Sequence, residues 1–365
     1  MQFLQELRQT LFDLRKRAFG GRRKRQPFLI TPGLPESLPR ETIESLCKEH
    51  FGGTPRSFRQ QHLSGWKSSG AYRIFAELEA GKEVSLIYKI AIYNTEDIPA
   101  LSGLPVQPGP AEFTILSHAD GPLAQYLPTV YLAEAVEPGK LYRYIMEDLG
   151  VHYYRAVDEE RPKAAALFPA FHDAMLCWDV LQDSGLIHYG RDFSTALQVY
   201  ALPRFEQYAA AHNDDLAIRE LLNNWSAIAR IHLDEAFFQV GPHSLIHGDP
   251  NYSNVYLHKE NTQKMKLVDW EWAGYGTPYA DLVSFLKGAP SHLERLTVDQ
   301  MAAHLNQPAA EAHRLFAWCQ MERGILDAAF LSVQALNTEH QTRFSLHSAV
   351  TSSARLAIRA YQQLR

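Results

Sequence analysis

Cysteine is scarce in this chain, and the few cysteines form no recognisable pattern. The 365 residues include three, Cys47, Cys177 and Cys319, an odd number at wide spacing. This arrangement gives neither a disulfide framework nor the closely spaced pairs of a zinc site. The thiols indicate a reducing compartment, and we predict a cytoplasmic protein.

Long apolar runs, internal repeats and an excess of basic residues are also lacking. No stretch of the sequence is long and apolar enough to cross a membrane. The formal net charge is −5, so the whole chain lacks the basic footprint of a nucleic-acid-binding protein. Because 46% of the residues are hydrophobic, the chain can bury sizeable cores, and its length predicts two or three folding units.

What the chain does contain is a concentrated polar motif. Segment 247–254 reads HGDPNYSN, and another acidic residue follows at Asp269. In ATP-dependent phosphoryl transfer, one carboxylate orients or deprotonates the attacking hydroxyl, while an amide oxygen and a second carboxylate hold Mg²⁺ against the phosphates. We predict these roles for Asp249, Asn254 and Asp269, in that order.

The residues between Asn254 and Asp269 explain how the two could meet. Segments 255–257 and 265–268 resemble short strands around a polar turn, and a hairpin there returns Asp269 to Asn254. So few oxygen ligands suit Mg²⁺ better than zinc or copper. For His247 we predict a structural role, packed under the loop and hydrogen-bonded to its backbone, rather than metal binding.

These residues resemble the aminoglycoside phosphotransferase and choline kinase branch of the protein-kinase-like fold. The resemblance rests on segments 247–254, 269–271 and 276–282, which occur in the family's order and at its separations. It implies an α+β fold with two lobes, a β-rich N-lobe and a mostly helical C-lobe. It also implies ATP, or alternatively GTP, as the phosphoryl donor. Asp281 resembles the family's aspartate that braces the catalytic loop, although an ordinary helix N-cap is the competing reading.

The resemblance requires a lysine that binds phosphate. Segment 85–93 is rich in strand-forming residues and contains a single lysine, Lys89, which we assign to this role. A glutamate on the next helix would hold its ammonium toward the phosphates. Glu112, just after Pro110, is the candidate. The alternatives are an edge-strand lysine and an exposed helical glutamate.

A turn containing glycine and serine precedes Lys89. Small residues there allow backbone N–H groups to approach phosphate oxygens, and we predict contacts at Ser68, Ser69 and Gly70. The same composition also makes ordinary hairpins.

After Lys89 and Glu112, the resemblance implies a hinge at the end of strand 141–146. The backbone around Glu147 and Asp148 would hydrogen-bond adenine, and Met146 would lie at the back of the pocket. The alternative is a buried strand that simply ends at Gly150.

The acceptor class is constrained by two departures from protein kinases. The segment between Asp269 and Asp281 is too short for a long peptide-binding activation segment, and Asn251 stands where serine/threonine kinases use lysine. Both favour a small-molecule hydroxyl acceptor. Glu271 could assist a second Mg²⁺, hydrogen-bond the acceptor or brace the loop. Aromatic residues nearby could form the acceptor wall or belong to the core, namely Trp270, Trp272 and Tyr275.

Three regions are expected along the chain. Residues 1–40 form a basic N-terminal extension, 41–148 the nucleotide-binding N-lobe and 149–365 a helical C-lobe with the catalytic loop and acceptor pocket. Residues 1–25 hold eight Lys or Arg against Glu6 and Asp13, a net of +6. A helix here could contact a membrane or protein partner, or pack on its own lobe. In the C-lobe we expect two helices across 203–238.

Together these features predict an ATP-dependent phosphotransferase that moves the γ-phosphoryl group to a hydroxyl of a small molecule, such as an antibiotic, sugar or amino alcohol. A catalytically silent kinase-like scaffold that engages a partner or membrane through its basic N-terminus is the alternative. A protein kinase is less favoured.

Overall fold

The computed structural model describes residues 38–63, 69–92, 102–104, 110–157, 159–176, 185–337 and 340–365. One compact unit runs from Arg40 to Arg365. The predicted N-terminal amphipathic helix lies outside the described residues, as do Ser68 and the side chain of Ser69.

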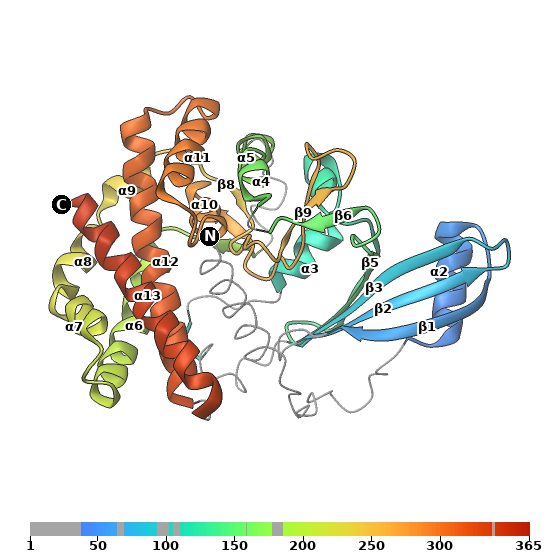
Figure 1. Ribbon diagram of the computed structural model, residues 1–365, viewed down its shortest axis with the longest axis horizontal. Coiled ribbons are helices and arrows are strands. Elements are labelled where there is room, and N and C mark those ends of the chain that lie inside the picture. The colour runs from blue at the N-terminus through green and yellow to red at the C-terminus, as the bar shows by residue number, and fades with distance from the viewer. Residues whose placement is uncertain are drawn as a thin grey trace, which may run out of the picture. The chain divides into compact units, whose positions relative to one another are not determined.

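The first third of this unit contains a five-stranded antiparallel sheet in the order β1-β2-β3-β5-β4, and Figure 1 labels all of these strands except β4. Buried and more exposed residues alternate along β3, the pattern of a strand that packs one face against a core. Helix α2 (Arg40–Phe51) precedes the sheet and buries Ile43, Leu46 and Cys47 at helical spacing. The strands are β1 (Pro55–Leu63), β2 (Ser69–Leu78), β3 (Glu83–Ile92), β4 (Val130–Glu137) and β5 (Leu141–Glu147).

The register of the sheet places the predicted lysine in its centre. Lys89 on β3 lies opposite Ala71 of β2 and Tyr144 of β5. Helix α3 (Pro110–Ser117) begins at a proline, whose missing N–H costs nothing in the first turn, and it buries Glu112. The predicted strand around Lys89 and the predicted helix around Glu112 are both confirmed.

Two small sheets hold the segments around the polar motif. Strands β9 (Val255–His258) and β10 (Met265–Leu267) form the predicted hairpin, with β6 (Tyr153–Arg155) on the other side of β9. The other sheet has the order β7-β11-β8, and its strands are β7 (Ile187–His188), β8 (Ser244–Ile246) and β11 (Gly274–Gly276).

Helices make up most of the remainder. A short 3-10 helix, η2 (Gly121–Tyr126), precedes β4. The expectation of two helices across 203–238 is wrong, because α6 already begins at Arg191 and continues through Pro203. The helices after β6 are α4 (Arg161–Ala165), α5 (Phe168–Leu176), α6 (Arg191–Ala211), α7 (Leu216–Asn223), α8 (Trp225–His232), α9 (Glu235–Gln239), α10 (Tyr279–Phe285), α11 (Ser291–His304), α12 (Ala309–Asn337) and α13 (His340–Leu364).

Helices α12 and α13 lie side by side over much of their length (Figure 1). They approach closely at Gly324, where an added Cβ would stand 2.7 Å from the Ala357 nitrogen and 2.8 Å from the Ser353 carbonyl oxygen. Only glycine permits this contact. The long α12 is thereby held firmly, which matters because it carries a residue of the site described below.

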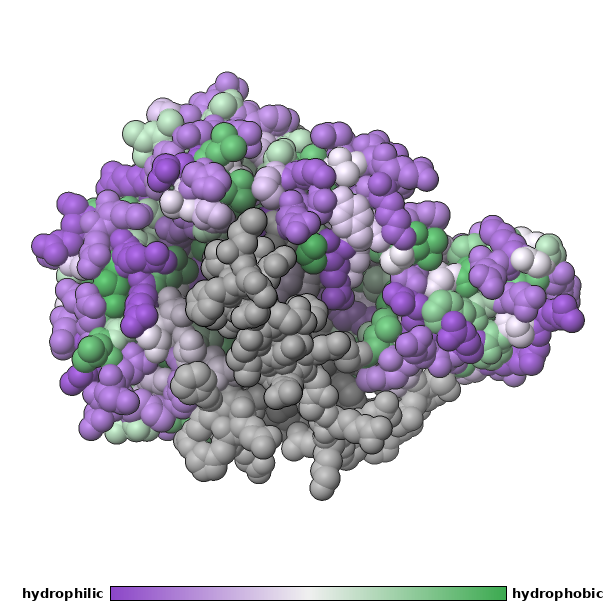
Figure 2. Space-filling model, in the orientation of Figure 1, coloured by the Kyte–Doolittle hydropathy of each residue, from purple (hydrophilic) through white to green (hydrophobic). Residues whose placement is uncertain are grey.

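Hydrophilic residues cover most of the visible surface of the described part, and hydrophobic residues form small separate groups (Figure 2). Among the helices described, none combines the length and apolar character that a membrane span requires.

Candidate active site

Lys89 is the centre of an ion-pair cluster built from three separate parts of the chain. Its Nζ donates to Glu112 Oε1 and Oε2 at 2.7 and 2.8 Å, and to Asp269 Oδ1 at 2.7 Å. Burial alone would lower the pKa of Lys89, but the carboxylates of Asp269 and Glu112 outweigh it and raise that pKa above its usual value. The ammonium is therefore charged and fixed between strand β3, helix α3 and the segment after β10.

The β9–β10 hairpin brings Asn254 and Asp269 together. The Val268 N–H donates to the Asn254 carbonyl oxygen at 3.0 Å, so the residue before Asp269 lies against Asn254. Asn254 is buried, and its Nδ2 donates to the Asp249 carbonyl oxygen at 3.0 Å. This leaves the Asn254 Oδ1, with one long contact from the Ser253 hydroxyl at 3.3 Å, and the half-exposed Asp269 carboxylate as oxygen donors.

These donors fit a magnesium ion better than a zinc ion. Mg²⁺ takes hard oxygen ligands and usually only one or two protein carboxylates, with phosphate and water completing its shell. Within the described ranges, no group of three or more His, Cys, Asp or Glu side chains is arranged to hold a metal by itself. Asp269 with Asn254 is the kind of sparse set that a nucleotide-bound Mg²⁺ needs.

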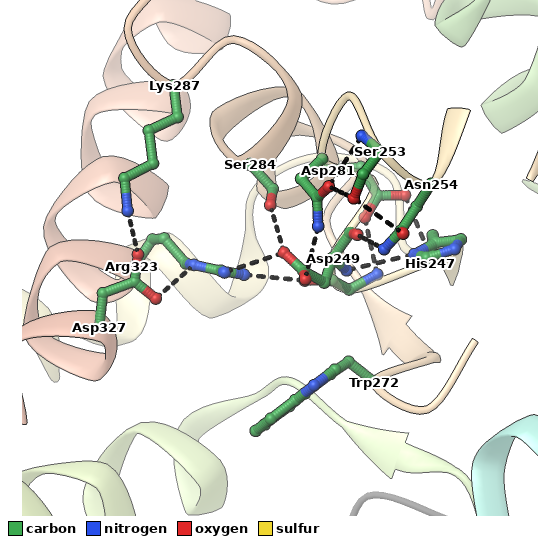
Figure 3. Close-up of polar contacts among 12 residues, drawn as sticks. His247, Asp249, Ser253, Asn254, Trp272, Asp281, Ser284, Lys287, Arg323 and Asp327 are labelled. Atoms are coloured by element: carbon green, nitrogen blue, oxygen red, sulfur yellow. Dashed lines mark hydrogen bonds and ion pairs between the residues drawn. The ribbon is translucent and has the colours of Figure 1, made fainter. Parts of the chain in front are cut away.

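Asp249 is held by contacts to both carboxylate oxygens (Figure 3). Its Oδ1 accepts from the Ser284 hydroxyl at 2.8 Å and from Arg323 Nη2 at 3.0 Å. Its Oδ2 accepts from Asn251 Nδ2 at 3.0 Å. Burial would raise the pKa of Asp249, but Arg323 and Ser284 outweigh it and lower the pKa below its usual value, so the carboxylate is ionised.

Asp281 braces the loop that carries Asp249. Its two carboxylate oxygens accept from the backbone N–H groups of His247 and Gly248, each at 2.8 Å. The reading of Asp281 as an ordinary N-cap is wrong, because α10 has its N-cap at Pro278 and Asp281 lies inside the helix. His247 is fully buried, and its Nε2 lies 2.9 Å from the Val268 carbonyl oxygen.

Burial of Asp281 makes stability depend on pH. Burial raises the pKa of its carboxyl to about 7 from the ordinary 3.8, although the two N–H donors oppose this. The folded state then binds more protons than the unfolded state between these two values, so stability falls as pH rises through that window. Between about pH 5 and pH 8, we expect the free energy of unfolding of the wild type to fall by about 2 kcal/mol more than that of Asp281→Asn.

Denaturant unfolding of both proteins across this pH range measures the difference. We expect Asp281→Asn to be less stable than the wild type throughout, because its single amide oxygen cannot replace both carboxylate oxygens as acceptors. Parallel pH profiles for the two proteins would contradict the buried titration.

The remaining predicted nucleotide contacts lie on the sheet and at its end. Gly70 pairs with Ile90, and Met146 is buried on β5. The Glu147 N–H donates to the Thr129 carbonyl oxygen at 2.8 Å. The buried Asp148 carboxylate accepts from three donors, which are Arg73, the Ser85 hydroxyl and the Gly150 N–H. The side chain of Asp148 is thus committed within the protein, and its predicted role depends on the backbone.

The segment after Asp269 contains one residue of the core, Trp270, and one that is partly exposed beside the site, Glu271. Trp270 is fully buried and its Nε1 donates to the Leu267 carbonyl oxygen at 3.0 Å, so it does not wall an acceptor pocket. Glu271 is partly exposed. Burial of its carboxyl and the neighbouring Asp269 raise the pKa of Glu271 to about 8. The carboxylates of Asp269, Glu112 and Asp249 disfavour a charge on Glu271, and its three predicted roles stay predictions.

Two residues that hold Asp249 escaped the sequence analysis. Ser284 lies on α10 and Arg323 on α12, 35 and 74 positions from Asp249. The one signal was the pair Glu322-Arg323, which interrupts a mostly apolar helical stretch. Charged residues on an otherwise buried helix are rarely accidental.

Residues 102–318 match the model of the phosphotransferase enzyme family. No curated protein sequence matches the chain.

Several solved structures share the fold. A choline/ethanolamine kinase family protein from Mesorhizobium loti has a TM-score of 0.52 at 15% identity, covering 89% of this chain and 98% of its own. The GDP complex of an aminoglycoside 2'-phosphotransferase-IIIa mutant gives 0.53 at 11% identity, covering 89% and 98%. A thermostable mutant of aminoglycoside phosphotransferase APH(4)-Ia gives 0.51 at 14%, covering 88% and 99%.

The predicted α+β protein-kinase-like fold, with a β-rich first lobe and a helical second lobe, is confirmed by these likenesses. The family match covers more than half of the sequence and includes the segment from Asp249 to Asp281. This chain belongs to the phosphotransferase enzyme family.

Proposed function

We propose that this protein transfers the γ-phosphoryl group of ATP to a hydroxyl group of a small molecule. The observation that carries the proposal is the convergence at Lys89, which pairs with Glu112 and Asp269 at 2.7 Å each. Binding of nucleotide phosphates requires such an arrangement: an ammonium held by one carboxylate, next to a second carboxylate that can bind a metal ion. GTP is the alternative donor.

On the nucleotide side, Lys89 binds phosphate oxygens while Glu112 keeps its ammonium in place. Asn254 and Asp269 would hold Mg²⁺, which would neutralise charge on the phosphates when bound. Gly70 lies on β2 beside β3, close in register to Lys89, and supports a role in covering the phosphates. The Glu147 N–H is already bonded to Thr129, so the Glu147 carbonyl and the backbone of Asp148, with Met146 behind them, are proposed to receive the adenine.

On the acceptor side, Asp249 orients the attacking hydroxyl through Oδ2. The hydroxyl oxygen forms a bond to the γ-phosphorus as the bond from that phosphorus to the β,γ-bridging oxygen breaks, and the proton passes to Asp249. Most of the acceleration comes from positioning and from fixed charges, because the carboxylate and ammonium are already in place before the reaction.

The short segment between Asp269 and Asp281 supports a small acceptor. Strand β11 and helix α10 begin at Gly274 and Tyr279, directly after Asp269, so no long peptide-binding segment intervenes. The similar structures are named as aminoglycoside phosphotransferases and a choline/ethanolamine kinase family protein. Their names support small hydroxylated amines as the first acceptors to test. The predicted division into 41–148 and 149–365 would place nucleotide and acceptor on different lobes.

The proposal is tested by an acceptor screen scored as ADP or GDP release. Purified protein is mixed with Mg²⁺, nucleotide and a library of aminoglycosides, macrolides, sugars and amino alcohols, with Asp249→Asn as the blank. We expect release that depends on one acceptor class and is absent from the blank. Formation of ADP or GDP only with casein-like proteins would favour a protein kinase. No ADP or GDP with any acceptor would favour a silent scaffold.

Glu112→Gln is expected to weaken ATP binding. The amide retains the size of the side chain but removes one of two negative charges that hold Lys89, and charge-assisted hydrogen bonds are worth more than neutral ones. The KM for ATP should rise about tenfold or more. Steady-state kinetics measures this, with Glu137→Gln as the matched control, because Glu137 is exposed and forms an ion pair with Lys140. An unchanged KM in Glu112→Gln would contradict the assignment.

A further inference from the structure

Helix α12 reaches the catalytic loop through a single arginine. Arg323 Nη1 donates to the Gly248 carbonyl oxygen at 3.0 Å, and its Nη2 donates to Asp249 Oδ1 at 3.0 Å. The two ends of one planar guanidinium thus hold the backbone of the loop and the carboxylate of the next residue (Figure 3). A rigid fork with two anchor points fixes orientation as well as position.

The arginine is itself fixed from behind. Its Nε lies 2.8 Å from Asp327 Oδ1, one helical turn further along α12. Asp327 Oδ2 accepts from Lys287 at 2.7 Å. Positive and negative groups therefore alternate from Lys287 through Asp327 and Arg323 to Asp249, as Figure 3 shows. This alternation leaves the guanidinium little freedom to rotate away from the loop.

The two carboxylate oxygens of Asp249 have different hydrogen-bond partners. Oδ1 accepts from both Ser284 and Arg323 and points toward α10 and α12. Oδ2 accepts from the side chain of Asn251 on its own loop. An oxygen with two short donors has little capacity for a third, whereas one with a single amide donor retains a lone pair. Oδ2 is therefore the oxygen available to an acceptor hydroxyl.

We propose that Arg323 is a positioning residue for phosphoryl transfer: it locks Oδ1 of Asp249 and the Gly248 carbonyl so that Oδ2 faces the acceptor. The inference rests on the proposed function. Because Arg323 acts through Asp249 rather than on the nucleotide, its loss affects the transfer step and leaves nucleotide affinity intact.

Lysine cannot replace this arginine fully. An ammonium retains the positive charge beside Asp249, but it lacks the planar fork that reaches Gly248, Asp249 and Asp327 together. Arg323→Lys therefore separates charge from geometry. Arg323→Gln removes the charge, and Arg323→Ala opens a space that free guanidine can enter.

The experiment compares these variants with the wild type under the conditions that give transfer. We expect kcat to fall about 100-fold in Arg323→Gln and by less in Arg323→Lys, because misplacement of a reacting group by about 1 Å has an effect of that size. The KM for nucleotide should remain that of the wild type. Added guanidine should raise kcat of Arg323→Ala and leave Asp249→Asn inactive. Arg314→Gln, an exposed arginine on the same helix, is the matched control.

A kcat in Arg323→Gln equal to that of the control would overturn the inference. So would a fall in kcat that guanidine does not reverse and that is matched by lost nucleotide binding, since that pattern reports general disruption of the lobe. Transfer by the wild type is read in the same assay. If the wild type transfers to no acceptor, the proposed function fails and the inference fails with it, whereas an active wild type with fully active Arg323 variants overturns the inference alone.

Discussion

Asp249→Asn is expected to abolish phosphoryl transfer while nucleotide binding persists. The amide occupies the same volume and still offers an oxygen to Ser284 and Arg323, which hold Oδ1 at 2.8 and 3.0 Å. It then presents Nδ2, a donor, where the acceptor hydroxyl requires a proton acceptor. General-base assistance contributes about 10²- to 10⁴-fold, so kcat should fall by that factor.

Transfer kinetics and nucleotide binding should be measured on the same preparation of this variant. Asp299→Asn is the control, because Asp299 is exposed and forms an ion pair with the half-exposed His313. Full activity in Asp249→Asn would refute the role of Asp249. Lost nucleotide binding would instead show that the substitution disturbs the neighbouring Asn254 contact to the Asp249 carbonyl.

Gly248→Ala is expected to be among the most destabilising single substitutions in the described part of the chain. Gly248 has φ +81°, and an added Cβ would stand 2.0 Å from the Trp272 carbonyl oxygen. That oxygen accepts from the Tyr189 hydroxyl at 2.7 Å, so it cannot withdraw without breaking a second contact. We expect the free energy of unfolding to fall by about 4 kcal/mol or more, a size that single substitutions reach only through severe structural conflicts.

Gly288→Ala separates steric conflict from backbone strain. Gly288 has φ +76°, nearly that of Gly248, but an added Cβ there meets nothing within 4 Å. A left-handed backbone conformation alone costs a non-glycine residue about 1–2 kcal/mol, so the free energy of unfolding of Gly288→Ala should fall by only that amount. Denaturant unfolding of both variants measures the difference. Equal losses would show that Trp272 moves aside easily and that the loop is not tightly packed.

Local sequence patterns were sufficient to predict the secondary structure around several site residues. The strand around Lys89, the helix starting at Pro110 and the β9–β10 hairpin each have short-range signals, namely β-branched composition, an N-terminal proline and a polar turn. The hairpin that joins Asn254 to Asp269 therefore followed from spacing. The ion pair of Lys89 with Asp269, 180 residues apart, was not predicted, because the family resemblance only assigned both residues to the phosphates.

Contacts between distant helices and the loop were beyond such reasoning. Packing of α10 and α12 brings Ser284 and Arg323 to Asp249, and nothing in the sequence near either residue specifies which loop it will contact. The start of α6 was missed for a related reason. The two predicted helices were placed across 203–238, but tertiary packing keeps Pro203 inside a helix that buries Tyr200 and Phe205 on either side.

The proposed magnesium–nucleotide site is tested most directly by thermal unfolding with ATP and with GTP, each with and without Mg²⁺, in wild type and Asp269→Ala. A ligand that binds only the folded state raises the melting temperature by mass action. We predict a rise with nucleotide that requires Mg²⁺ and is lost in Asp269→Ala. No shift with either nucleotide, or an equal shift in the variant, would contradict the site.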